Sequence, residues 1–253
     1  SYRYNWDDGQ YLLIFRQHNI TAPTVLSLHQ LYSSHTPAFV SLSSLSSTIL
    51  QNNYHYHAQP IALRYQLGDH VDYNATTNRY TESTTPVTSH SPILAWAADG
   101  LPVYGPYGYS SPLDPNSGVR RMVSGFVLRN GNYGTTNLTS TGRTTLPAWA
   151  QRIQTVTFKN GPAVSTNYAL GHYIEDFDYL GDRGYTLGVD FDLNEQNVRW
   201  CVTPEYPSGT WAYFTPINAD GTPQYPYTTG RQYYGSPNGG STTISETVTT
   251  YFN

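Results

Sequence analysis

Short runs of β-prone residues, most of them ended by Gly or Pro, follow one another along this chain and limit what it can fold into. Tyr, Thr, Val and Ile favour strands, whereas Gly, Pro and Asn favour turns. The sequence holds 24 Tyr, 21 Gly and 17 Pro, and only 12 % of its residues are charged, against about 25 % in ordinary proteins. The chain is therefore predicted to be mostly β, as an antiparallel sandwich or barrel-like single domain with few short helices.

The predicted strands are brief and separated by turn signals. Residues 1–16 are expected to form a hairpin around Asp7-Asp8-Gly9, with Tyr2, Tyr4 and Trp6 alternating along its first arm. One short helix is expected to start near Pro147, since proline suits the first helical position. Further strands are predicted at residues 37–42, 62–67, 93–97, 125–128, 153–158 and 211–215.

The chain is expected to divide into three parts. Residues 1–49 would supply strands packed on a main domain at 50–235, and residues 236–253 would form a strand-like extension. In that extension Ile244, Val248 and Tyr251 carry the apolar character, and Glu246 is the only charge between Ser241 and Tyr251. Proteins usually blunt exposed strand edges with charge, Lys or Pro. Both ends of the chain are therefore predicted to take part in self-assembly, the C-terminal one above all.

Charge and hydropathy exclude several partners. The formal net charge of −4 gives no basic field for nucleic acid or acidic membranes. No apolar run approaches the ~20 residues that a transmembrane helix needs. Ser1 is interpreted as a mature N-terminus after processing. Three Asn-X-Thr sequons, at Asn19, Asn74 and Asn137, favour an extracellular, secreted or cell-surface protein with N-linked glycans.

The string Tyr54-His55-Tyr56-His57 is the most unusual local pattern. On a strand, alternate side chains share a face, so His55 and His57 would point the same way. Two imidazoles at that spacing can chelate copper or zinc. Asp99, in a predicted Asp-Gly turn, is the best choice for a third ligand. The alternative is a polar strand face with hydrogen-bonded histidines, and for Asp99 a bond from the amides of its own turn.

A third region runs from Asp192 to Pro207 and holds the single cysteine. Arg199 lies close in sequence to Asp192, Asn194 and Glu195, which favours an internal salt bridge, with a catalytic cluster as the alternative. Cys201 is interpreted as a small buried apolar residue. A lone cysteine excludes an internal disulfide framework.

These three clusters, in this order, resemble the YHYH family of extracellular proteins. The similarity rests on the YHYH string itself, on WAADGLPVYGPYGY at 96–109 and on RWCVTPEYPSGTWAYFT at 199–215, and it spans residues 50–235. Two positions depart from the expected pattern, since Asn194 replaces an acid and Val198 a glycine. Some relatives carry a second histidine string where this chain has Trp211-Ala212-Tyr213-Phe214, so a four-histidine metal site is not implied here.

Three functions are compatible with these features. The first is a secreted structural protein, the subunit of an extracellular fibre or other homo-polymer whose partners are copies of itself and glycans. The second is an extracellular copper or zinc module that uses the YHYH histidines. The third is a hydrolase, for which the sequence shows no catalytic triad, paired-carboxylate motif or metalloprotease motif. The structural role explains the Tyr- and Thr-rich, Lys-poor composition best, and an enzyme is the less favoured reading.

Overall fold

The computed structural model describes residues 58–153 and 159–237. The described strands outnumber the helices, and the helices are short, which confirms the mostly β prediction. Strands β1 to β10 are Val71–Asn74, Arg79–Glu82, Ile93–Trp96, Pro102–Tyr104, Tyr107–Ser111, Asp114–Arg121, Phe126–Leu128, Phe177–Tyr179, Val198–Cys201 and Thr210–Phe214. The α-helices are α3 (Ile61–Gln66), α4 (Leu138–Thr141) and α5 (Ala148–Ile153), and the 3-10 turns are η2 (Asn132–Gly134), η3 (Ile174–Asp176) and η4 (Leu180–Arg183).

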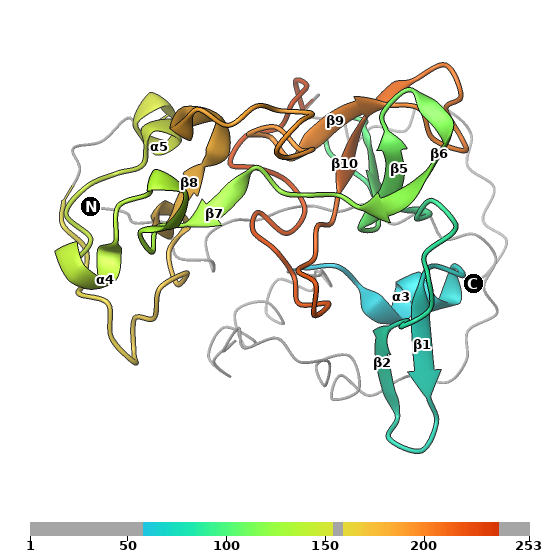
Figure 1. The fold of residues 1–253 in the computed structure, drawn as a ribbon, viewed down its shortest axis with the longest axis horizontal. Helices are drawn as coiled ribbons and strands as arrows, with labels where there is room; N and C mark the ends of the chain where they lie inside the picture. The colour runs from blue at the N-terminus through green and yellow to red at the C-terminus, as the bar shows by residue number, and fades with distance from the viewer. Residues whose placement is uncertain (1–57, 154–158, 238–253) are drawn as a thin grey trace, which may run out of the picture.

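The described strands form one four-stranded sheet and three two-stranded sheets, with no closed barrel among them. The central sheet has the order β3-β4-β10-β9, in which β10 is parallel to β4 and antiparallel to β9. The pairs β1–β2, β5–β6 and β7–β8 are antiparallel. In Figure 1 the strands β5, β6, β9 and β10 lie to the right, and β7, β8, α4 and α5 lie to the left.

Each half has its own buried cluster. On the left, Phe126, Trp149, Phe177 and Tyr225 pack around α5 and β8, and the Phe177 and Tyr225 rings stack at 4.2 Å. On the right, the central sheet buries apolar side chains on both of its faces. Gly125 lies where the halves meet, because a Cβ there would come within 2.6 Å of the Leu193 carbonyl oxygen. Glycine thus permits the close approach of these two segments.

Several predicted elements are confirmed and one is wrong. Strands β3, β7 and β10 lie at the predicted positions, as does α5, which begins one residue after Pro147. Residues 62–67 were expected as a strand, but 61–66 form the helix α3. Ala, Leu, Arg and Gln are good helix formers, and the helical turn brings the Arg64 guanidinium to the buried Asp69 carboxylate at 2.5 Å.

Other expectations concern residues outside the described part of the chain. These are the N-terminal hairpin at 1–16, the strand at 37–42, most of the strand at 153–158 and the tail after 237. The assembly residues Tyr2, Tyr4, Trp6, Ile244, Val248 and Tyr251 lie there, as do His55, His57 and Asn19. Within the described ranges, no helix is both long and apolar enough to cross a bilayer.

Candidate functional site

The two faces of the central sheet carry different chemistry. Along β10, Trp211 and Tyr213 point to one face and Ala212 and Phe214 to the other, as the period of two requires. The first face holds Ala95, Val103, Val198 and Tyr213, with Trp211 packed at its margin. Strands from both long sequence motifs therefore meet in one sheet, and the regions 96–109 and 199–215 form a single structure.

Asp99 connects three segments of the first face. Its Oδ2 accepts hydrogen bonds from the Tyr213 hydroxyl at 2.7 Å and from the Gly235 amide at 2.9 Å. Its Oδ1 accepts from the Leu101 amide at 3.3 Å, inside its own turn. The Tyr213 hydroxyl in turn accepts from the Tyr234 amide at 2.8 Å. Asp99 thus braces β10 and the chain at 234–235 against the turn after β3.

This bracing bears directly on the metal prediction. Both Asp99 oxygens already accept hydrogen bonds, and a cation would have to compete with those donors. Among the described residues, no three His, Cys, Asp or Glu side chains come together in a way that could hold an ion. His55 and His57 lie outside the described ranges, so metal binding by this pair stays a prediction.

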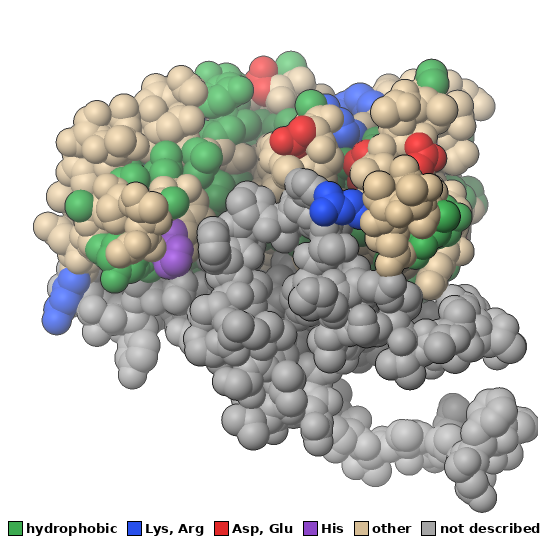
Figure 2. Space-filling model, turned by 90° about the horizontal axis from the view of Figure 1, so that it is seen from below, with side chains coloured by type: hydrophobic (Ala, Val, Ile, Leu, Met, Phe, Trp, Pro, Cys, Tyr) green, Lys and Arg blue, Asp and Glu red, His purple; other side chains and the backbone are tan. Residues whose placement is uncertain are grey.

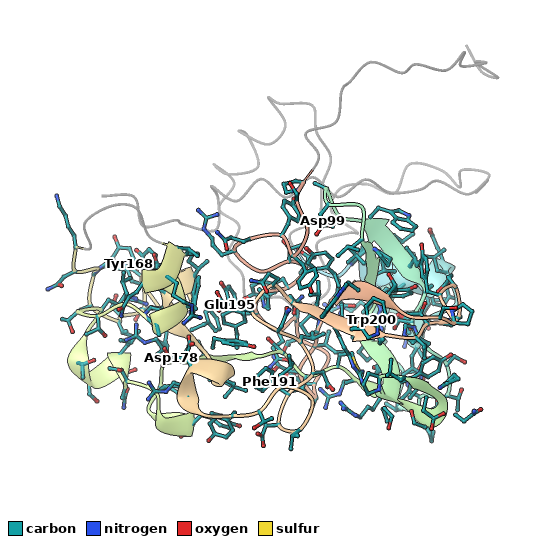
Figure 3. The ribbon with its side chains drawn as sticks, turned by 90° about the horizontal axis from the view of Figure 1, so that it is seen from above. Asp99, Tyr168, Asp178, Phe191, Glu195 and Trp200 are labelled. Carbon is teal, nitrogen blue, oxygen red and sulfur yellow. The ribbon has the colours of Figure 1, made fainter. Side chains whose placement is uncertain are left out.

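An aromatic strip lies at the margin of the same face, formed by Trp200, Trp211 and Tyr234. Trp200 on β9 is paired in register with Trp211 on β10, and their ring centroids are 5.7 Å apart. The Tyr234 ring packs against Trp211 at a tilt of 33°, with a centroid distance of 4.2 Å. Trp200 is 43 % exposed and Tyr234 is 40 % exposed. Figure 3 shows Trp200 on the same half of the molecule as Asp99.

Sequence reasoning did not identify this aromatic strip. Only Trp211 lies in a predicted strand, at 211–215. No strand was predicted around Trp200, although Val198 and Trp200 have the spacing of two that places side chains on one face of a strand. The register that sets Trp200 opposite Trp211, and the hydrogen bonds that hold Tyr234 beside them, depend on the tertiary structure.

The second face holds a polar cluster around the half-buried His90 and the buried Tyr104, with the exposed Glu205 at its margin. The Tyr104 hydroxyl lies 2.9 Å from both Glu205 Oε2 and Thr203 Oγ1, and burial raises the pKa of Tyr104. The His90 ring packs edge-on against Tyr104 with a centroid distance of 4.9 Å, and its Nδ1 lies 2.8 Å from the Ser91 carbonyl. Burial lowers the pKa of His90. A neutral imidazole, carried by the loop between β2 and β3, and a protonated phenol therefore line this face.

The sequence favoured a salt bridge between Arg199 and a nearby acid, and this prediction is wrong. Its guanidinium is buried and donates to the Tyr109 carbonyl at 2.9 Å and to the Ser110 carbonyl at 3.3 Å, which anchors β9 to β5. The nearby acids pair elsewhere: Asp192 binds Arg120 at 2.6 Å, and Glu195 binds Arg152. The alternation of side chains along β9 directs Arg199 toward β5. Asp192 and Glu195 therefore form their ion pairs with other arginines.

Cys201 is buried and free, as the sequence indicates. Burial raises the pKa of its thiol to about 11, so the side chain is a neutral thiol at physiological pH. Reactive cysteines need a lowered pKa and access to solvent. Cys201 therefore serves as a core residue of the second face.

The two described sequons differ in their surroundings. Asn74 is exposed at the end of β1, and its Oδ1 accepts from the Thr76 and Thr77 amides at 2.9 and 3.0 Å. Asn137 is half-buried and caps α4 through a bond from the Thr139 amide at 3.1 Å. An N-linked glycan is attached through Nδ2, which leaves Oδ1 available for the turn. Asn74 is thus the more accessible acceptor of the two.

These observations define a β-rich protein whose long motifs build one mixed sheet, braced through Asp99 on one face and lined by His90 and Tyr104 on the other. A family model described as YHYH protein matches residues 46–230, and the chain belongs to this family. No curated protein and no solved structure shows a significant match to the chain.

Proposed function

We propose that this chain is a secreted structural protein, a subunit of an extracellular assembly built from copies of itself. The observation that supports this role is the use of charged motif residues for internal contacts. Asp99, Arg199 and Glu205 each hold distant parts of the chain together. An active site needs polar groups that converge on a substrate, whereas a scaffold needs groups that fix its own segments.

Surface features add to this proposal. Among the described residues on the face seen in Figure 2, acidic and basic side chains are few and interspersed among uncharged ones. Such a surface suits contacts between identical subunits, where large fields of one sign would repel. N-linked glycans, at Asn74 first, would be the second kind of partner. The tail at 241–253 is the segment proposed to complete a sheet of a neighbouring copy.

Sedimentation of two forms of the protein tests this proposal. The full-length chain is expected to form species whose size grows with concentration, because a head-to-tail contact does not close on itself. A form that lacks residues 241–253 is expected to remain a folded monomer with an unchanged circular dichroism spectrum. The proposal is wrong if the full-length chain is a monomer at every concentration.

A further inference from the structure

The aromatic strip of Trp200, Trp211 and Tyr234 has the properties of a ligand surface. Exposed apolar residues scattered singly need no explanation, whereas contiguous exposed apolar patches mark interaction sites. The three rings come from two paired strands and from the segment that Asp99 braces. The bracing bonds, Gly235 N–H to Asp99 and Tyr234 N–H to the Tyr213 hydroxyl, fix the backbone that carries Tyr234. The surface is thus preorganised.

Gly209 supports the exposed indole of Trp200 from one side. A Cβ built on Gly209 would lie 2.9 Å from Trp200 Cζ2 and 3.1 Å from Cε2, and the φ of this glycine is +95°. Bare backbone therefore packs against atoms of both rings of the indole. The rest of the indole remains accessible, which accounts for its 43 % exposure.

The edge of β9 does not suit an added peptide strand. In an antiparallel pair, alternate residues direct both backbone groups away from the partner strand. The Val198 amide donates to Asn194 Oδ1 at 3.1 Å, and its carbonyl accepts from the Asn194 amide at 3.0 Å. The Val202 amide donates to the Pro112 carbonyl at 2.8 Å. Only Trp200 lies between these two occupied positions, and strand addition needs a longer run of pairings.

The chemistry of the strip indicates its ligand. Indole and phenol rings combine an apolar face with a polar N–H or O–H, and the residues 207–210 that lead into β10 (Pro-Ser-Gly-Thr) carry no charge. A pyranose in a β-1,4-linked chain offers flat patches of C–H groups, with hydroxyls at its rim. We propose that the strip binds a neutral β-1,4-linked glycan by stacking of sugar rings on Trp200 and its neighbours. This inference is independent of self-assembly and adds a ligand to the surface of each subunit.

Titration of the full-length protein with cellohexaose tests the site, with isothermal calorimetry and tryptophan fluorescence as readouts. Trp200→Ala is expected to weaken binding by about fivefold, since ring stacking is worth roughly 1 kcal/mol. The matched control is Tyr65→Ala, because Tyr65 is 42 % exposed and lies on α3, away from the strip. Tyr65→Ala should bind as the parent does. Affinity should not change between low and high salt, because the ligand is neutral.

Four results would overturn the proposal. These are no binding of cellohexaose to the parent, unchanged binding by Trp200→Ala, an equal loss in Tyr65→Ala, or binding that high salt abolishes. Sedimentation of Trp200→Ala separates this inference from the assembly proposal. A smaller assembly in that variant would assign the strip to contacts between copies, whereas intact assembly with lost glycan binding supports the assignment made here.

Discussion

At the scale of single residues, Asp99 is the clearest case of a motif residue with a definite physical task. The backbone turn needs only one of its oxygens. The other oxygen accepts hydrogen bonds from Tyr213 and Gly235, which are 114 and 136 residues away in sequence. Hydrogen bonds to a charged acceptor are among the stronger ones in proteins. The Asp-Gly pair therefore does more than form a turn.

Replacing Asp99 with Asn should destabilise the protein by about 1.5–3 kcal/mol, because the amide offers one acceptor oxygen where the carboxylate offers two, so at least one of the three donors would face an NH2 group. The control is Asp114→Asn, an exposed position whose Oδ1 accepts one local bond from the Asn116 amide at 2.9 Å. Urea denaturation of both variants measures the difference. Equal stability of the two would show that the Asp99 brace contributes little.

The position of His90 leads to a defined pH dependence of the folding stability. Its pKa is lowered in the folded protein by burial, so the unfolded chain binds this proton at a higher pH than the folded chain does. The stability that His90 contributes is fully present above about pH 6.5, the ordinary pKa of histidine, and declines as the pH falls toward the folded value. The charges of Glu205 and Asp69 oppose the shift, whereas that of Arg199 adds to it.

The measurement compares the parent with His90→Gln between pH 7.5 and 5. The stability advantage of the parent over this variant should shrink as the pH is lowered, because the other titrating groups are common to both proteins. An advantage that is constant or grows toward pH 5 would contradict the burial of a neutral imidazole at this position.

The histidine pair of the YHYH string leads to a separate prediction about metals. If His55 and His57 chelate copper or zinc, the protein as isolated should hold about one ion per chain, and the double change of both to Ala should remove it. Inductively coupled plasma mass spectrometry of both proteins gives the stoichiometry. The absence of stoichiometric metal in the parent would leave the pair as a hydrogen-bonded structural element.

At the scale of elements, α3 and the β1–β2 hairpin are joined through a buried arginine. The Arg64 guanidinium binds Asp69 and Glu82, and the Tyr107 hydroxyl donates to Glu82 Oε2 at 2.8 Å. The side chains of Arg64 and Asp69 are almost fully buried. This network ties the helix, the residue Asp69 just before β1, and β2 to β5.

Arg64→Met should therefore destabilise the protein by about 3–5 kcal/mol, since it leaves two carboxylates without their cation. Arg152→Met is the matched control. Arg152 also binds two carboxylates, those of Asp182 and Glu195, but its side chain is 46 % exposed. Its loss should cost about 1 kcal/mol or less. Thermal unfolding of both variants measures these losses of stability. Losses of similar size in the two variants would contradict the role assigned to burial of the arginine.

Elements with a strong local signal could be predicted from the sequence, and those fixed by distant partners could not. The strand β3 and helix α5 were marked by an apolar run and by Pro147. The helix α3 was missed because its apolar run resembles a strand, while its anchor, Glu82, is 18 residues beyond Arg64. The Asp-Gly turn at 99–100 was readable, since Gly100 adopts φ of +82°. The donors that Asp99 receives from Tyr213 and Gly235 were not, because no local pattern connects such distant positions.

At the scale of the whole molecule, the two halves behave as one scaffold with different surfaces. The half around β7, β8 and α5 buries aromatic rings and the Arg143–Asp176 pair, whose nitrogen and oxygen atoms are 2.7 Å apart. The half around the central sheet carries the family motifs and presents the aromatic strip. A protein of this kind can be rigid inside and still offer one surface to the proposed glycan and another to the proposed assembly.

Electron microscopy of the purified full-length protein tests the central claim most directly. A structural subunit that polymerises head to tail should give filaments of uniform width at high concentration, and removal of residues 241–253 should abolish them while the protein stays folded. Single, separate particles of the full-length chain at every concentration would contradict the account.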